Sequence, residues 1–297
     1  HPTPEQAIAG FEDEQARGIA IDAPFRNYKD RYSKPETVIA LSPMRVLTGV
    51  RPVEQLKTLA AAFGATWLEE RAELSPKQLL TEIIHLPQET ASAEVQHLVD
   101  TAPGLLGASN EVVADAAELV RIVDGKYPGD RGLLVAFVMN LVHLAPGESA
   151  FTPDGQVHAY VSGTAIELMN PSDNVMRAGL TAKHIDTEEL IKVLGEKQDA
   201  PVIQRPNPEE GPLGTYAMWD ERMSVTRVRI EEGKPLNYSF KGISAALSVA
   251  GQVTIQAKDG NGTDEFVLGA TESVLHVGEP SEAVLSGSGE LYIASYV

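Results

Sequence analysis

The stretch HAYVSGTAIELMNPSDNVMRAGLTAK, residues 158–183, sets a histidine, a carboxylate, an arginine and a lysine among glycines and apolar residues. Side chains two positions apart share one face of a strand, so His158 and Tyr160 are expected to point the same way. If residues 162–164 turn the chain back as a hairpin, Glu167 returns beside His158 on the inner face. Inward histidine and glutamate side chains are costly in an apolar strand pair unless they are paired or coordinated. The stretch therefore predicts β-strands that surround a polar site.

Segments on both sides of this stretch also have strand character. ETVIAL (36–41) is β-branched and apolar, LLVAFVMNLVHL (133–144) follows a period of two, and a Pro-Gly turn precedes SAFTP (149–153). Short strands joined by glycine and proline turns favour a β-sandwich or barrel over an α/β sheet.

Residues 53–126 instead have a helical pattern. Ser75 is a plausible N-cap with Pro76 at the first helical position, and Gly64 ends an earlier helix. NEVVADAAELVRIV (110–123) repeats its apolar residues at helical spacing. We expect three or four packed helices here, and shorter helices near the start of the chain and after Asp186.

In the last part of the chain, residues again alternate between the two faces of a strand. In SVTRVRI (224–230), one face takes Thr226, Val228 and Ile230, and the other takes Arg227 and Arg229. Two further strands flank Asp-Gly-Asn-Gly at 259–262, which predicts a hairpin. PVIQRPNPEEGP (201–212) reads as an extended connection. The sequence predicts a mainly β protein with a helical insertion: one β-unit in two parts, 1–52 and 127–200, a helical domain at 53–126, and a second β-unit at 201–297.

The composition indicates a globular protein, because 43% of the 297 residues are hydrophobic and only 22% are charged. A formal net charge of -18 disfavours nucleic acid as a partner. No apolar run reaches the roughly eighteen residues of a membrane span, and no basic-then-apolar leader opens the chain. The chain has no cysteine, which excludes disulfides and thiolate metal sites. We expect a cytoplasmic protein with no membrane association.

Candidate metal ligands are His1, Glu36 and His158. Two imidazoles and one carboxylate leave coordination positions open, which fits catalytic zinc and equally fits non-haem Fe(II). In the alternative interpretation, His158 is a strand histidine bonded to a neighbour, and Glu36 is an ordinary loop carboxylate. Arg177 and Lys183 are the natural contacts for an anion.

Other candidates carry less information. Gly179 favours a backbone that passes close to a ligand. Five further histidines have no assigned role and are expected to be packed or solvated, or lack a partner that the sequence identifies: His85, His97, His143, His184 and His276.

Three segments resemble type I mannose-6-phosphate isomerase, a zinc-dependent enzyme of the cupin fold. They are HPTPEQAIAGF (1–11), NYKDRYSKPETVIALSPMRVLTGVRP (27–52), and the long stretch from DGKYPGDRG to LTAKHID (124–186). The resemblance implies cupin-type β-barrel or jelly-roll units, the first of which is the catalytic domain. It also implies a role in carbohydrate metabolism, the interconversion of mannose 6-phosphate and fructose 6-phosphate.

By the same resemblance, His1 matches the histidine of the family's Gln-x-His-Pro motif, and it binds Zn2+ with Glu36 and His158. The Gln two positions earlier is the family's fourth ligand. Since the sequence opens at His1, we expect that this Gln and an N-terminal segment before it are lacking.

The remaining matched residues line the family's active site: Lys34, Tyr160, Glu167, Arg177 and Lys183. We expect Glu167 to be the base that shuttles the proton, with Lys34 as the alternative. Lys34 would otherwise assist the developing oxyanion, and Arg177 with Lys183 would stabilise anionic oxygens and hold the phosphate.

Two other functions stay open at this point, a non-catalytic cupin that binds a sugar phosphate and an Fe(II) cupin oxygenase. The expected partner is a small-molecule sugar phosphate, and the expected oligomeric state is a monomer.

Overall fold

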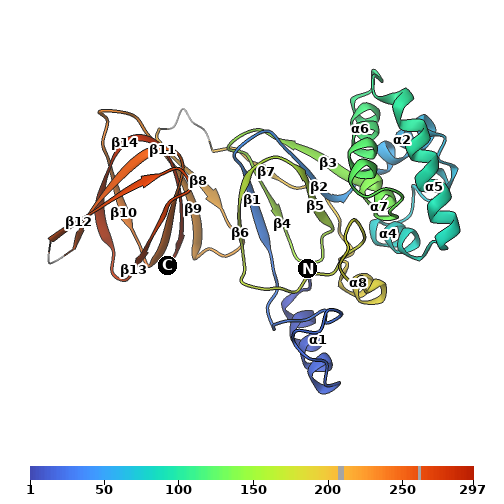
Figure 1. The fold of residues 1–297 in the computed structure, drawn as a ribbon, viewed down its shortest axis with the longest axis horizontal. Helices are drawn as coiled ribbons and strands as arrows, with labels where there is room; N and C mark the ends of the chain where they lie inside the picture. The colour runs from blue at the N-terminus through green and yellow to red at the C-terminus, as the bar shows by residue number, and fades with distance from the viewer. Residues whose placement is uncertain (207–210, 260–261) are drawn as a thin grey trace. The chain divides into compact units, whose positions relative to one another are not determined.

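The computed structural model describes residues 1–206, 211–259 and 262–297. Contacts divide the chain into two compact units. The first unit comprises His1–Pro146 and Ala150–Ile203, and the second comprises Gly147–Ser149 and Gln204–Val297. Figure 1 shows the strands and helices of both.

Two small sheets form the β part of the first unit. Their strands are β1 (Glu36–Ala40), β2 (Met44–Val50), β3 (Met139–Leu144), β4 (Ser149–Thr152), β5 (His158–Ser162), β6 (Ala165–Met169) and β7 (Ile203–Gln204). One sheet has the order β6-β1-β4-β7 and the other β3-β2-β5. An apolar cluster joins them, since it takes side chains from β1, β2, β3 and β4: Val38, Ala40, Met44, Val46, Leu144 and Ala150.

The register of the strands places the polar candidates on the inner face of this sandwich. Val46 lies opposite Tyr160, and Thr48 opposite His158. Val38 lies opposite Glu167. Directly opposed residues share a face, so these polar residues point the same way as the buried Val38 and Val46.

The chain passes between the two sheets at a corner. The backbone N–H groups of Leu41 and Ser42 both donate to the carbonyl oxygen of Thr164, at 2.8 and 3.2 Å. Gly163 has a φ of +116°, and a Cβ there would lie 2.8 Å from Cβ of Met44. The predicted hairpin of residues 158–169 is therefore wrong: β5 pairs with β2, and β6 pairs with β1. The reason is that two tight turns pack on each other, and each carries its strand to a different sheet.

Most helices of the first unit fall between β2 and β3. They are α2 (Val53–Phe63), α3 (Thr66–Glu69), α4 (Pro76–His85), α5 (Gln88–Thr101), η1 (Ala102–Leu105), α6 (Glu111–Lys126) and α7 (Gly132–Val138). The predicted ends are confirmed, because the Ser75 hydroxyl accepts from the N–H of Gln78, and Gly64 closes α2 with a φ of +64°. The apolar repeat of 110–123 is likewise the buried side of α6.

Residues 133–138 differ from the prediction, since they form α7 where a strand was expected. All seven residues of α7 are buried. A short segment that is apolar on every side has neither the period of a strand nor that of an amphipathic helix, so its pattern cannot decide. The ring of Phe137 packs edge-on against Phe63 of α2, with centroids 4.9 Å apart. The strand begins only at Met139.

Two further helices stand near the site. α1 (Pro4–Ala16) and α8 (Thr187–Val193) are the shorter helices that the sequence predicts. Thr3 forms a capping box on α1, and Asp186 caps α8. The hydroxyl of Tyr28, in the loop after α1, donates 2.6 Å to Glu189 of α8. This contact ties the loop that leads into β1 to α8.

The described part of the second unit is one antiparallel β structure of seven strands. They are β8 (Leu213–Ala217), β9 (Met223–Ile230), β10 (Leu236–Phe240), β11 (Ile243–Asp259), β12 (Gly262–Gly269), β13 (Ser273–Val277) and β14 (Ser281–Tyr296). In β9, Val228 and Ile230 are buried and Arg229 is exposed, which confirms the predicted alternation.

Strands β11 and β12 pair antiparallel, although the turn of the predicted hairpin, residues 260–261, lies outside the described residues. The same holds for residues 207–210 of the expected connection. The predicted mainly β fold with a helical insertion is confirmed. Among the described residues, every helix is too short or too polar to cross a bilayer.

Candidate metal centre

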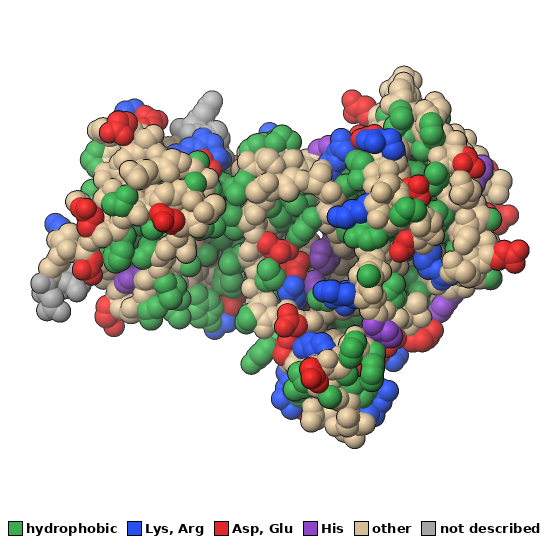
Figure 2. All heavy atoms as spheres, viewed as in Figure 1, with side chains coloured by type: hydrophobic (Ala, Val, Ile, Leu, Met, Phe, Trp, Pro, Cys, Tyr) green, Lys and Arg blue, Asp and Glu red, His purple; other side chains and the backbone are tan. Residues whose placement is uncertain are grey.

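Three side chains converge at the inner face of the sandwich. Glu36 opens β1, His158 opens β5, and His1 precedes α1. Nε2 of His1 lies 3.0 Å from Oε1 of Glu36, and Nε2 of His158 lies 3.1 Å from Oε2 of the same carboxylate. One donor atom from each residue falls within 4.8 Å of the others. Figure 2 shows histidine, acidic and basic side chains gathered around a hollow in this part of the first unit.

The two imidazoles are held by their other nitrogens. Nδ1 of His1 is 2.8 Å from the carbonyl oxygen of Asn174, and Nδ1 of His158 is 3.1 Å from that of Gln156. Since a carbonyl only accepts, each Nδ1 carries the proton, and each Nε2 faces Glu36. A neutral imidazole would then present a lone pair to a carboxylate. Either a second proton on the imidazole or a cation between the two groups removes this conflict, and histidine metal ligands are commonly oriented in this way.

Glu36 is almost fully buried, with 3% of its surface exposed. Burial by itself raises the pKa of a carboxyl group, but the hydrogen bonds and charges of His1 and His158 outweigh it and hold the pKa of Glu36 well below its usual range. Nζ of Lys34 adds a third contact, 3.0 Å from Oε1. Glu36 is therefore an anion at neutral pH.

Asn174 anchors the centre from behind and is wholly buried. Its Oδ1 accepts from the N–H of Lys29 at 2.7 Å, and its Nδ2 donates to the carbonyl oxygens of Asp30 and Tyr32 at 3.0 and 2.9 Å. Its own carbonyl accepts from His1. One side chain thus fixes the loop before β1 and the backbone that orients a metal-facing histidine.

A second carboxylate, Glu167, lies on the strand beside Glu36. Glu36 lies opposite Met169 and Glu167 opposite Val38, so the two glutamates are diagonal neighbours on one face. The hydroxyl of Tyr160 donates 2.6 Å to Oε1 of Glu167.

The surroundings of Glu167 favour its protonated form. Burial and the negative charge of Glu36 raise the pKa of Glu167, although the Tyr160 hydrogen bond and the Lys34 charge oppose them. The site therefore contains one carboxylate that is held ionised and a second that accepts a proton more readily.

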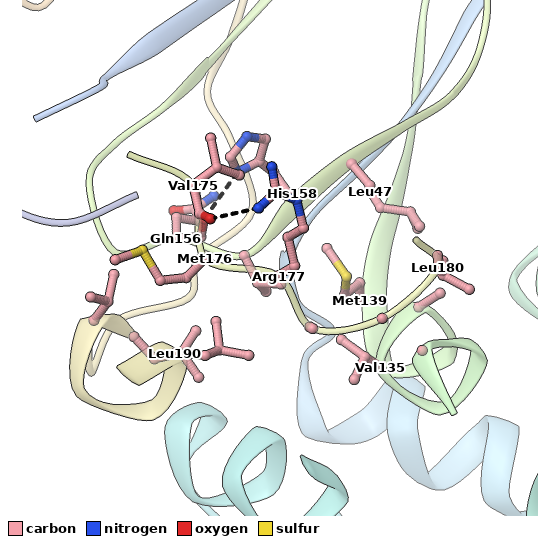
Figure 3. A pocket seen from close by; sticks show the side chains of 18 of the residues that line it. Leu47, Val135, Met139, Gln156, His158, Val175, Met176, Arg177, Leu180 and Leu190 are labelled. Atoms are coloured by element: carbon pink, nitrogen blue, oxygen red, sulfur yellow. Dashed lines mark hydrogen bonds between the residues drawn. The ribbon is translucent and has the colours of Figure 1, made fainter. Parts of the chain in front are cut away.

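A cavity of about 240 Å³ adjoins the histidines. Figure 3 shows Gln156, His158 and Arg177 at one end of this cavity, and apolar side chains from α7 and α8 around the rest. The apolar lining includes Leu47, Val135, Met139, Met176, Leu180 and Leu190.

The structure brings six of the eight predicted site residues together: His1, Lys34, Glu36, His158, Tyr160 and Glu167. Arg177 lines the cavity, where its Nη1 donates to its neighbour's carbonyl, that of Val175, at 3.0 Å. Lys183 is exposed and is not among the residues that line this cavity.

Gly179 also lines the cavity, but its closest approach differs from the expectation. A Cβ at Gly179 would lie 2.6 Å from Cα of Gly132. The glycine is thus required by the backbone at the start of α7.

Three of the other histidines bind elsewhere. Nε2 of His85 contacts Glu188 at 3.1 Å, that of His97 contacts the Phe63 carbonyl at 2.8 Å, and that of His143 contacts Asp115 at 2.8 Å. Within the described part of the chain, His1, Glu36 and His158 are the single group of three His, Asp or Glu donors with metal-binding spacing.

No protein-family model matches the chain. It is 35% identical over 215 residues to mannose-6-phosphate isomerase of Salmonella typhimurium, which covers 68% of this chain and 53% of the relative. It is 30% identical over 291 residues to mannose-6-phosphate isomerase of Bos taurus, which covers 88% of this chain and 68% of the relative. The chain spans about half the length of several of the curated relatives it matches.

Solved structures agree with these relatives. A crystal structure of mannose 6-phosphate isomerase from Salmonella typhimurium, bound to substrate and a zinc atom, superposes with a TM-score of 0.84 at 26% identity. It covers 100% of this chain and 74% of that one. A second structure of mannose 6-phosphate isomerase, bound with zinc and yttrium, also gives a TM-score of 0.84.

The fold and the site define a cupin-type protein in which two histidines and one carboxylate could hold a metal ion. Both relatives described above are mannose-6-phosphate isomerases. The chain belongs to the mannose-6-phosphate isomerase family.

Proposed function

We propose that this protein interconverts mannose 6-phosphate and fructose 6-phosphate with the aid of zinc. The observation that carries the proposal is the convergence of His1, Glu36 and His158 next to a second, separately held carboxylate, Glu167. Named relatives of the same activity support it.

His1, Glu36 and His158 would hold the zinc through two Nε2 atoms and one carboxylate. These donors suit zinc, and three protein ligands leave room for water or substrate. Bound zinc supplies a Lewis acid that polarises an oxygen of the open-chain sugar.

The chain's own residues move the proton. Glu167 takes the proton from C2 of open-chain mannose 6-phosphate, which leaves an enediolate. The hydroxyl proton of O2 passes to O1, and Glu167 returns its proton to C1 to give the ketose. Tyr160 holds Glu167 in place by its 2.6 Å hydrogen bond. The ammonium group of Lys34 lies on the same side of Glu36 as His1 and stabilises negative charge on the sugar oxygens.

The phosphate group of the substrate would be bound by the two cationic side chains of residues 175–183, Arg177 and Lys183. Arg177 lines the cavity and offers a planar fork of donors. Lys183 is exposed and free to swing as a point charge toward a bound anion.

The order of helices and strands along the chain supports the domain limits predicted from the sequence. We assign residues 1–52 and 127–200 to a catalytic cupin domain, 53–126 to a helical domain, and 201–297 to a second cupin-like domain. A cytoplasmic location and a monomeric state stay predictions of the sequence.

The test is turnover of mannose 6-phosphate by the complete gene product, stripped with a chelator and then given zinc. We expect activity that disappears on chelation and returns with zinc. Glu36→Gln should prevent the return. His143→Ala, which changes an exposed histidine bound to Asp115, should not.

Two outcomes would replace the proposal. Binding of the sugar phosphate without turnover would identify a binding cupin. Oxygen consumption with iron, and none with zinc, would identify an oxygenase.

A further inference from the structure

The segment that carries Arg177 is fixed at both ends. At one end stands Asn174, with its buried amide. At the other, Oδ1 of Asp130 accepts from the N–H of Leu180 at 3.2 Å and from the N–H of Gly132 at 2.7 Å. One carboxylate oxygen therefore joins the segment to the first residue of α7.

The segment approaches α7 closely because a glycine lies on each side of the contact, Gly179 in the segment and Gly132 in the helix. A Cβ on Gly132 would lie 2.8 Å from Cγ of Leu180 and 2.9 Å from its nitrogen. A Cβ on Gly179 would lie 2.9 Å from Oδ1 of Asp130 and from the nitrogen of Gly132. Backbone meets backbone here, and a side chain at either position would separate them.

Leu180 adopts an unusual conformation at this contact. Its φ is +54°, one of two positive values among the described non-glycine residues. Such a conformation persists in a leucine only where the surroundings enforce it. The Asp130 carboxylate bonds the backbone nitrogen of this same residue.

We propose that Asp130 is a positioning residue that holds Leu180 in this conformation and thereby sets where Arg177 lies on the cavity wall. Asp130 itself does not line the cavity. Its importance for catalysis rests on the proposed function, in which Arg177 binds anionic oxygens.

The first test follows the backbone and needs no activity. In zinc-loaded Asp130→Ala, the amides of residues 175–183 should exchange hydrogen faster than in the wild type, by about tenfold or more. Asp130→Asn keeps an oxygen acceptor and should restore much of the protection.

The control is Asp124→Ala. This change removes the carboxylate whose Oδ1 accepts a 3.1 Å hydrogen bond from the backbone N–H of Gly129. Gly129 directly precedes Asp130 in the chain. Unchanged exchange in Asp130→Ala, or equal loss of protection in the control, would overturn the proposal.

The second test uses turnover of mannose 6-phosphate. Asp130→Ala should lower kcat/KM by about 10- to 100-fold with zinc content unchanged, since a misplacement of about 1 Å has that effect. Combined with Arg177→Ala, it should add little, because both changes remove the same interaction. Independent, additive losses would contradict a role through Arg177. A wild-type protein without turnover would instead refute the proposed function, and the exchange measurement would still decide the role of Asp130.

Discussion

The hydroxyl of Tyr160 on β5 donates a 2.6 Å hydrogen bond to Oε1 of Glu167 on β6, and the two strands belong to different sheets. The bond therefore links the two sheets beside the candidate metal ligand His158, whose ring centroid lies 6.3 Å from that of Tyr160. It gives the proposed base a fixed position that does not depend on the metal.

Tyr160→Phe tests this position. Loss of the hydroxyl leaves Glu167 without its short hydrogen bond, and we expect kcat to fall about tenfold while zinc content stays unchanged. Steady-state kinetics with mannose 6-phosphate and metal analysis measure both. Tyr32→Phe, at a ring that is 61% exposed, is the matched control and should behave as the wild type.

Glu167→Gln should abolish turnover and spare the metal. The amide is isosteric but cannot take up the proton, and general-base groups contribute about 10²- to 10⁴-fold. Turnover is measured together with zinc stoichiometry. If the variant retains turnover, Glu167 is not the base, and Lys34 becomes the candidate.

Asn174→Ala should weaken zinc binding although Asn174 contributes no ligand atom. The change removes the bonds that hold the backbone acceptor of His1, and such supporting contacts are worth about 10- to 100-fold in metal affinity. Competition with a chromophoric chelator measures the affinity. Asp173→Ala is the control, because Asp173 contacts Asp30 through its backbone N–H, which the substitution keeps. Equal zinc affinity in all three proteins would refute the role of Asn174.

Asp154→Asn should stabilise the protein at neutral pH. Burial raises the pKa of Asp154, against hydrogen bonds from Ser33 and Lys34, and its Oδ1 has no hydrogen-bond partner among the described residues. A raised pKa in the folded state means that ionisation costs stability, so the folded protein loses stability as the pH rises through that pKa.

The variant avoids this loss. Its advantage in the free energy of unfolding should be near zero at acidic pH, where the carboxyl group is protonated in both states, and should grow as the pH rises to 7. Urea denaturation at several pH values measures it. An advantage that does not grow with pH would contradict this explanation.

Local signals in the sequence account for much of the fold. Ser75 with Pro76, and Gly64 with its positive φ, act on their own helix ends, so their effect can be predicted from neighbours in the chain. The helix at 132–138 and the turn at 162–164 could not be, because tertiary packing decides them: the first is apolar on every side, and the second packs on residues 41 and 42.

The site divides in the same way. The residue types of His1, Glu36 and His158 indicate metal chemistry, and strand alternation indicates Glu167 on the same face. The family resemblance adds a role for Lys34. Asn174 and Asp130 were missed, because their partners are distant in the sequence. An asparagine shortly after a proline, or an aspartate beside a glycine, looks like an ordinary turn residue.

The spacing of the metal donors bears on how the protein folds. Glu36 and His158 are 122 positions apart, and the whole helical segment from α2 to α7 lies between them. An ion held by both would close this long loop, and the unfolded chain could not offer the donors together. Metal binding would then raise the free energy of unfolding of the ligand strands and of the helices between them together. Chelation should therefore loosen helices that contribute no ligand at all.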